Sequence, residues 1–277
     1  MKARGHPPVN EARPTTGGPR GWGKFLGILM LPAVWELLSR SGLVNPFFIP
    51  PFSQVAVAAW ELAASGMLTV HGLLSLERSL AGLAIAVILG VPLGLLLADW
   101  FKRLELIVNP VLEFLAQINP FIMFHLILCF VPLGEMVQIT IIAWACVWPV
   151  LYNTSAGVQT INPALIKAGR SFGLNYPALF WKVIVPAAAP AIFAGIRLGA
   201  GYSVFMLIAA EMMGSTSGLG WLVASSQANY EVARIFAAAL IIALLGLGLD
   251  LALQFAGRRF AVAEDEDSQL LRIGWLD

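Results

Sequence analysis

The chain has 277 residues, of which 58% are hydrophobic and only 12% are charged, and its formal net charge is +1. An ordinary soluble domain carries about twice this share of charged residues, so the composition excludes a soluble globular protein. The length accommodates six membrane crossings of about 20 residues with their loops, and leaves no room for a large soluble domain. We therefore expect an all-α membrane protein with six transmembrane helices.

Residues 1–23 are predicted to form a cytoplasmic N-terminal tail, which contains a partial match to a nucleotide-binding motif. A Gly-x-x-x-x-Gly-Lys run beginning at Gly18 matches most of a phosphate-binding loop, but Phe25 stands where the magnesium-binding Ser or Thr is required. No strand precedes it. We therefore predict no nucleotide site here, and expect Trp22 and Lys24 to anchor the first span at the membrane interface.

Six apolar segments follow, and together they predict a transmembrane domain over residues 24–259. After the first span, a proline-rich stretch leads to Ser53, which can cap an amphipathic helix running to Ser65. Cys129 and Cys146 fall inside apolar segments and are expected to be buried, unreactive thiols. The predicted spans are residues 24–40, 76–98, 107–131, 136–156, 189–212 and 235–256.

The distribution of basic residues predicts the orientation of these spans. With the N-terminus in the cytoplasm, most of the 17 Lys and Arg residues lie on the cytoplasmic side, as the positive-inside rule requires. Arg78 then falls at the outer boundary of the second span. Both termini and a polar loop at residues 160–188 are predicted to be cytoplasmic. The C-terminal residues 260–277 form an acidic cytoplasmic tail with no implied chemistry.

Polar residues within the third predicted span are candidates for a translocation pathway. Glu113 and Gln117 are four residues apart and share one helical face, and His125 lies two turns beyond Gln117. Asn119 belongs to the same group. Ionisable groups facing lipid are costly, so this stripe meets either water or another helix. We take Gln117, Asn119 and His125 as candidate pathway residues, with hydrogen bonding between helices as the alternative.

The fifth span contributes two more pathway candidates, Ser203 and Glu211. Glu211 lies near the outer mouth, where it either pairs with a partner residue or faces the pathway. Arg197 is left within the same span, and Asp250 of the sixth span can pair with it and hold the bundle together. Glycine pairs with Gly-x-x-x-Gly spacing, in spans two and five, predict close helix packing within the subunit rather than between subunits.

The loop between the fourth and fifth spans reads as a helix-turn-helix. Asn162 can cap a helix that Pro163 starts, and Gly173 supplies the left-handed residue that ends it. Asn175 can cap a second short helix, which Pro186 would stop. An amphipathic element of this size is too short to be a domain, and it predicts docking onto another protein.

The same loop contains the frame Lys167-Ala168-Gly169-x-x-x-Gly173, followed after nine residues by Val183-Ile184-Val185-Pro186. This frame resembles the signature of inner-membrane permease subunits of ABC importers, which reads E-A-A-x-x-x-G, nine residues, then I-x-L-P. Lys167 and Gly169 depart from that signature. In the family this loop forms coupling helices that sit in a cleft of the ATPase subunit. The resemblance assigns ATPase coupling to Lys167, Ala168, Gly169, Arg170, Phe172, Gly173 and Pro186.

The start of the fifth span, from Gly195 to Gly201, and its end, from Ala209 to Gly220, resemble the same family. The Pro-Pro-Phe-Ser-Gln-Val stretch beginning at Pro50 resembles its nitrate/sulfonate/taurine branch. We therefore expect a member of the nitrate/sulfonate/taurine/bicarbonate branch. The resemblance implies a type I ABC importer permease fold with a cytoplasmic coupling helix-turn-helix, in a bacterial inner membrane. It also implies a second permease subunit, two ATPase subunits that bind ATP and magnesium, and an external solute-binding protein.

The expected function is a pathway for a small solute, an oxyanion of the nitrate, sulfonate, taurine or bicarbonate type. A flavin or pyrimidine-precursor solute is an alternative within the same class. An ion-coupled secondary transporter and a structural membrane protein are alternatives from other classes. The sequence contains no HExxH motif, no paired-cysteine zinc spacing and no nucleophile–base constellation. We therefore expect no catalysis, no metal and no cofactor in this chain, and no nucleic-acid partner.

Overall fold

The computed structural model describes the chain from residue 20 to residue 273 except for residues 43–44, 46, 101 and 131–133, and all described elements are helical. The side chains of residues 20–29, 99–106 and 258–273 also lie outside the described set. The glycine motif that begins at Gly18 therefore falls outside the residues whose surroundings are described. The chain divides into two units, one up to Gln54 and one from Val55 onward.

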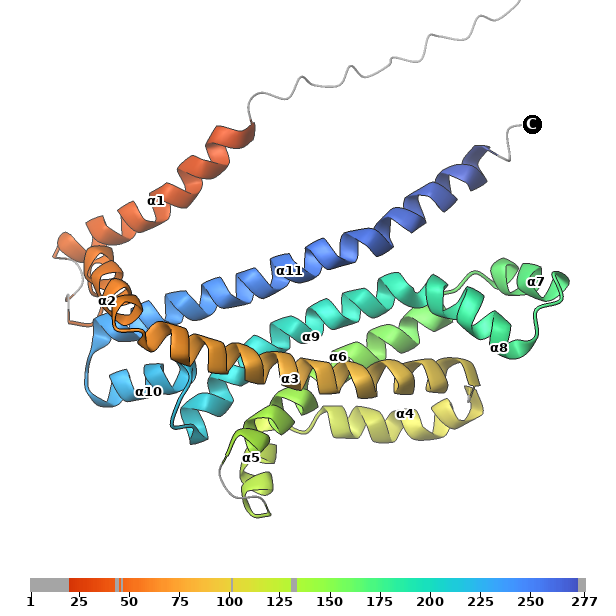
Figure 1. Cartoon of the computed structure of the whole chain (residues 1–277), viewed down its shortest axis with the longest axis horizontal. Coiled ribbons are helices and arrows are strands. Elements are labelled where there is room, and N and C mark those ends of the chain that lie inside the picture. Colours follow the sequence, from red (N-terminus) through yellow and green to blue (C-terminus); the bar gives the residue numbers. More distant parts are fainter. Residues whose placement is uncertain (1–19, 43–44, 46, 101, 131–133, 274–277) are drawn as a thin grey trace, which may run out of the picture. The chain divides into compact units, whose positions relative to one another are not determined.

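The helices follow the predicted order of apolar segments, with several shorter helices between them (Figure 1). The π-helical turn η1 (Leu96–Trp100) extends α3, and the π-helical turn η2 (Phe180–Ile184) directly precedes α9. The α-helices are α1 (Arg20–Arg40), α2 (Phe52–Ala64), α3 (Met67–Leu95), α4 (Lys102–Ala116), α5 (Pro120–Leu128), α6 (Glu135–Gln159), α7 (Pro163–Ser171), α8 (Tyr176–Leu179), α9 (Val185–Gly214), α10 (Leu219–Ala228) and α11 (Val232–Ile273).

In the first unit, the segment after α1 folds back onto that helix. The indole nitrogen of Trp35 donates to the carbonyl of Pro50 at 3.1 Å. Glu36 accepts from both the backbone N–H and the hydroxyl of Ser53, each at 3.0 Å. The prediction that Ser53 caps α2 is wrong, because the helix already begins at Phe52 and the Ser53 hydroxyl is bound to the Glu36 carboxylate.

The core of the second unit lies where α3, α6 and α9 pack together (Figure 1). Both predicted glycine pairs face α6. A Cβ added at Gly94 would lie 2.7 Å from Cβ of Thr154, and one added at Gly195 would lie 2.8 Å from Cβ of Asn153. Packing within the subunit is therefore confirmed, and close backbone approach is what such glycines permit. The buried core side chains are Leu83, Ala86, Ile142, Ala145, Cys146, Ala200, Met206 and Leu207.

The two cysteines differ from each other. Cys146 is buried in this core, as predicted, and its thiol donates to the carbonyl of Gly199 at 3.2 Å. The same prediction is wrong for Cys129, which is exposed in the isolated chain. Cys129 follows α5 directly as its C-cap residue, and its thiol donates to the carbonyl of His125 at 3.5 Å.

Within the described part of the chain, four helices have the length and apolar character of a membrane span, namely residues 67–98, 135–159, 176–214 and 232–257. A fifth is obtained when α4 and α5 count as one broken span. These two helices meet at an angle of 83°. The third span predicted over residues 107–131 is therefore not one continuous helix, and the bend that Pro120 is expected to cause in it is confirmed.

The break in the third span has a local cause. Pro120 disfavours helical geometry at the residue before it, and Asn119 adopts extended backbone with φ −64° and ψ 125°. The Asn119 side chain then accepts from the N–H of Phe121 at 2.9 Å and caps a new helix. A single helical face from Glu113 to His125 consequently does not exist.

Helix boundaries also differ from the prediction at two other places. α3 begins at Met67 rather than at residue 76, so Arg78 lies well inside the helix rather than at its outer boundary, and only 4% of it is exposed. α11 continues to Ile273 without a break at residue 259. The acidic run of residues 264–267 thus belongs to a helix, although its side chains lie outside the described set.

Candidate functional site

The loop at residues 160–188 has the predicted helix-turn-helix geometry. Asn162 caps α7 by accepting from the backbone N–H two residues on at 2.9 Å, and Pro163 occupies the first turn. Gly173 follows α7 with φ 75°, in the left-handed region that favours glycine. Asn175 caps α8 by accepting from the N–H three residues on at 3.2 Å. These four local predictions are confirmed.

Pro186 does not end the second helix, so that prediction is wrong. Helix α8 passes directly into the π-helical turn η2, and α9 begins at Val185 with Pro186 in its first turn. A proline is compatible with this position because the first turn of a helix leaves its N–H groups without helical partners. The loop is therefore joined to a long membrane helix without an intervening coil.

The predicted coupling residues lie mostly on the surface of this loop. Lys167, Ala168, Arg170 and Pro186 are exposed, and the side chain of Phe172 is 86% exposed. Leu165 and Trp181 add further exposed apolar surface, at 50% and 68%. The loop also borders a cavity of about 670 Å³, to which Phe172, Lys182 and Pro186 contribute.

Gly169 explains one departure from the family signature. It is buried, and a Cβ added there would lie 2.6 Å from Cδ1 of Leu179. The loss of the signature's second alanine therefore lets α7 and α8 pack more closely. Lys167 is exposed and forms no ion pair with any described residue.

Three of the predicted pathway residues lie at the break between α4 and α5. Gln117, Asn119 and His125 are all exposed. Asn119 serves as the cap of α5, and Nδ1 of His125 lies 2.9 Å from the carbonyl oxygen of Phe121. The break therefore brings polar groups to a bend between two short helices, rather than aligning them along one helix.

The other two pathway candidates, Ser203 and Glu211, are fully buried within the subunit. The hydroxyl of Ser203 lies 2.8 Å from that of Ser79 on α3, and it donates to the carbonyl of Ala200 on its own helix. In this conformation neither Ser203 nor Glu211 reaches solvent. A pathway role for them stays a prediction.

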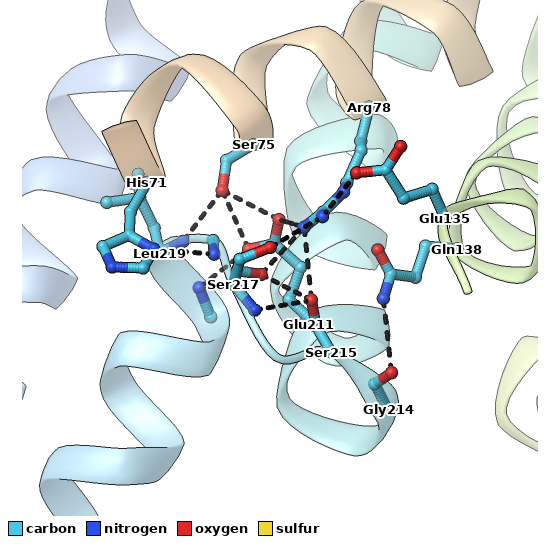
Figure 2. Close-up of polar contacts among 12 residues, drawn as sticks. His71, Ser75, Arg78, Glu135, Gln138, Glu211, Gly214, Ser215, Ser217 and Leu219 are labelled. Carbon is cyan, nitrogen blue, oxygen red and sulfur yellow. Dashed lines mark hydrogen bonds and ion pairs between the residues drawn. The ribbon is translucent and has the colours of Figure 1, made fainter. Parts of the chain in front are cut away.

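Glu211 forms the centre of a buried polar cluster at one end of the helices (Figure 2). Its carboxylate accepts from Nη1 of Arg78 at 2.9 Å and from the backbone N–H of Gly220 at 2.8 Å. The Ser75 hydroxyl lies 2.8 Å from both carboxylate oxygens and accepts from the N–H of Leu219. This carboxylate therefore joins α3, α9 and α10.

Arg78 extends the cluster to α6 (Figure 2). Its Nη2 lies 3.0 Å from a carboxylate oxygen of Glu135 and also binds the hydroxyl of Ser217, while Nη1 donates to the carbonyl of Ser217. Sequence reasoning left open that Glu211 pairs with a partner residue, but it did not identify Arg78, which it placed at the outer boundary of the second span. The available signal was that Arg78 and Glu211 are oppositely charged and both lie near the outer ends of predicted spans, where such groups pair.

The predicted pairing of Arg197 with Asp250 is confirmed. Nε of Arg197 lies 2.6 Å from one carboxylate oxygen, and Nη2 lies 3.2 Å from the other. Unlike the buried cluster, this pair is open: the two side chains are 51% and 38% exposed. Both residues line a cavity of about 690 Å³ beside α9.

The binding-protein-dependent transport system inner membrane component family matches residues 90–262 of this chain. The chain belongs to this family. Its permease character and the predicted branch are confirmed by relatives of similar length. The aliphatic sulfonates transport permease protein SsuC of Bacillus subtilis is 31% identical over 82% of each chain, and the taurine transport system permease protein TauC of Escherichia coli is 30% identical over 84% of this chain and 86% of its own.

A bicarbonate transport system permease protein, CmpB of Synechocystis, is 27% identical over 82% of the permease and 84% of its own length. Among solved structures, a chain of the inward-facing MetNI methionine ABC transporter superposes with a TM-score of 0.62 at 16% identity, covering 68% of the permease and 93% of that chain. A chain of a bacterial alginate ABC transporter gives 0.57 at 15% identity, covering 87% and 95%. The permease therefore shares the fold of ABC importer membrane subunits.

Proposed function

We propose that this ABC importer permease forms the translocation pathway for a small oxyanion that an external binding protein delivers. Relatives of about its own length are named for aliphatic sulfonates, taurine and bicarbonate, and an anionic oxygen group is common to all three. Neutral donors such as amides and hydroxyls suit such a solute, because many fixed cations would bind it too tightly for release. The polar break around Gln117, Asn119 and His125 supports this assignment.

The proposed topology has six spans in a bacterial inner membrane, with both termini and the loop at residues 160–188 in the cytoplasm. The spans are α1, α3, the broken pair α4 and α5, α6, α9 and α11. The excess of Lys and Arg that this arrangement places in the cytoplasm supports it. A second copy of the permease completes the pathway.

The loop is proposed to dock onto an ATPase subunit, which supplies the ATP and magnesium sites. The observation that carries this proposal is the exposure of Phe172, at 86%, on a helix-turn-helix whose ends are fixed by Asn162, Gly173 and Asn175. A large aromatic side chain at the tip of a well-defined loop is typical of a contact surface. Since α8, η2 and α9 are continuous, movement of the docked loop would be transmitted directly to a pathway helix.

The proposal is tested in liposomes that contain the permease with its ATPase and binding protein. We expect ATP-dependent uptake of at least one of taurine, ethanesulfonate, bicarbonate and nitrate. Uracil and riboflavin represent the alternative solute class of flavins and pyrimidine precursors. Uptake of these compounds without uptake of any oxyanion would show that the permease carries this alternative class. Uptake driven by a proton gradient without ATP would establish a secondary transporter instead.

A matched pair of variants tests the docking role. Phe172→Ala is expected to lower ATPase binding and solute-stimulated ATP hydrolysis about tenfold, because exposed aromatic anchors dominate interface energies. Phe130→Ala removes a similarly exposed phenylalanine, at 82%, from a different part of the chain. ATPase binding that is unchanged in Phe172→Ala would exclude this contact.

A further inference from the structure

The ion pair between α9 and α11 is open to its surroundings although it lies within long apolar helices. Arg197 is 12 residues from the first residue of α9 and 17 from the last, and Asp250 lies in the apolar part of α11. Their side chains are 51% and 38% exposed. Charged groups that face acyl chains are costly, so this face is expected to meet water or a polar molecule rather than lipid.

The space beside the pair is large enough for a small solute. A cavity of about 690 Å³ is bordered by Arg197 and Asp250 together with apolar and aromatic side chains, among them Tyr202 and Phe205. Gly201 also borders it, and a Cβ added there would meet nothing within 4 Å. A mainly apolar cavity with a small number of polar or charged groups is the usual form of a small-molecule site.

The guanidinium of Arg197 has donor capacity that the pair does not use. Asp250 binds Nε and Nη2, whereas Nη1 has no partner among the described residues. A planar guanidinium with free N–H groups is well suited to a sulfonate, carboxylate or similar oxyanion. Asp250 also accepts a hydrogen bond from Nε2 of Gln254 at 2.7 Å. Its carboxylate therefore keeps one hydrogen-bond donor when the Arg197 side chain moves away to bind a solute.

We propose that Arg197 and Asp250 form a substrate subsite, in which the oxyanion of the transported solute takes over N–H groups of Arg197 that Asp250 holds when the site is empty. This inference deepens the proposed function and rests on it. Competition from Asp250 keeps the complex weak, which a transport pathway requires for release. An arginine without a counter-ion would retain the anion.

Protection of an engineered thiol in the cavity tests the subsite. The assembled complex carries Cys129→Ser, Cys146→Ala and Gly201→Cys, and its reaction rate with a maleimide is measured with ethanesulfonate, bicarbonate or uracil present. We expect at least one of the two anions to slow labelling and uracil to have no effect. Gly248→Cys is the control, since its Cβ also meets nothing within 4 Å but Gly248 does not border this cavity.

Variants that remove the charge of Arg197 or Asp250 then test whether this ion pair is responsible for the protection of the thiol at position 201. Arg197→Gln should require about tenfold more anion for the same protection, because a charged hydrogen-bond donor is lost, and Asp250→Asn should require less. The double variant, Arg197→Gln with Asp250→Asn, leaves no unpaired charge and controls for misfolding. It should assemble normally and show the same loss of protection as Arg197→Gln.

The outcomes separate this inference from the proposed function. Equal protection of the Gly201→Cys complex with and without Arg197→Gln, protection by uracil alone, or oxyanion uptake without any protection at position 201 would each overturn the subsite. Failure of the liposomes to import any oxyanion with ATP would overturn the proposed function, whatever the labelling shows.

Discussion

At the scale of single residues, the permease contains two ion pairs with opposite surroundings. Arg78 and Glu211 are 4% and 0% exposed and are enclosed by further hydrogen bonds, whereas Arg197 and Asp250 border a cavity. A buried charge is tolerated only when it is paired and hydrogen-bonded. The first pair therefore holds helix ends together, and the second has donors left for other partners.

Neutralising Glu211 should therefore destabilise the permease. In Glu211→Gln the buried guanidinium of Arg78 loses its closest counter-charge, which costs on the order of 3 kcal/mol of folding free energy. The measurement is the midpoint of thermal unfolding of the purified complex in detergent. Glu135→Gln is the matched control, because Glu135 binds the same arginine but its side chain is 63% exposed. Its effect should stay within about 1 kcal/mol, and equal shifts for both variants would contradict the structural role of Glu211.

The predicted pathway role of His125 calls for a different readout. His125→Leu removes a ring that is exposed near the break between α4 and α5 and should lower uptake about five- to hundred-fold if the solute uses this group. Basal ATP hydrolysis and assembly should be unchanged, since the contact of Nδ1 with Phe121 lies within a single helix. His125→Gln, which keeps a donor, should restore part of the uptake. Normal uptake by His125→Leu would leave this residue with a structural role only.

At the scale of elements, the loop at residues 160–188 depends on one backbone conformation. Gly173 has φ 75°, and an added Cβ meets nothing within 4 Å, so any effect of a side chain there comes from the backbone. Valine at this φ is a steric outlier, whereas asparagine tolerates it. Gly173→Val should reduce ATP hydrolysis stimulated by the loaded binding protein several-fold, without preventing membrane insertion. Gly173→Asn should remain close to wild type, and a normal rate for Gly173→Val would refute the coupling argument.

The helix caps show which local features could be predicted from sequence. The tripeptide Ile-Asn-Pro occurs twice, and in both copies the asparagine accepts from the N–H two residues on at 2.9 Å. At Asn162 the surrounding polar residues made the cap evident. At Asn119 the same signal lay within an apolar segment, so Pro120 predicted a bend in the span but Asn119 was not predicted to cap a new helix. Side-chain capping and proline geometry override hydropathy at such a site.

At the scale of the whole molecule, contacts between helix faces could be predicted from residue spacing. Contacts between helix ends that lie far apart in the sequence could not. The glycine spacing predicted close packing of α3 and α9, and the lone charges Arg197 and Asp250 predicted their own pairing. The cluster around Glu211 includes Ser75, which lies before the predicted start of the second span and belongs to α3 because that helix begins at Met67. It also includes the N–H of Gly220, which follows the turn at Gly218, with φ 112°, at the start of α10. Neither position follows from periodicity.

The orientation of the entire chain gives the last prediction. In a background without native cysteines, Phe48→Cys should react with an impermeant maleimide in intact cells, since Phe48 is 68% exposed and follows the first span. Ala168→Cys should react only after the cytoplasmic face is opened, and more slowly when the ATPase subunits are bound. The excess of basic residues in the predicted cytoplasmic segments is the physical reason. The reverse labelling pattern would invert the topology, and it would place the loop where no ATPase can reach it.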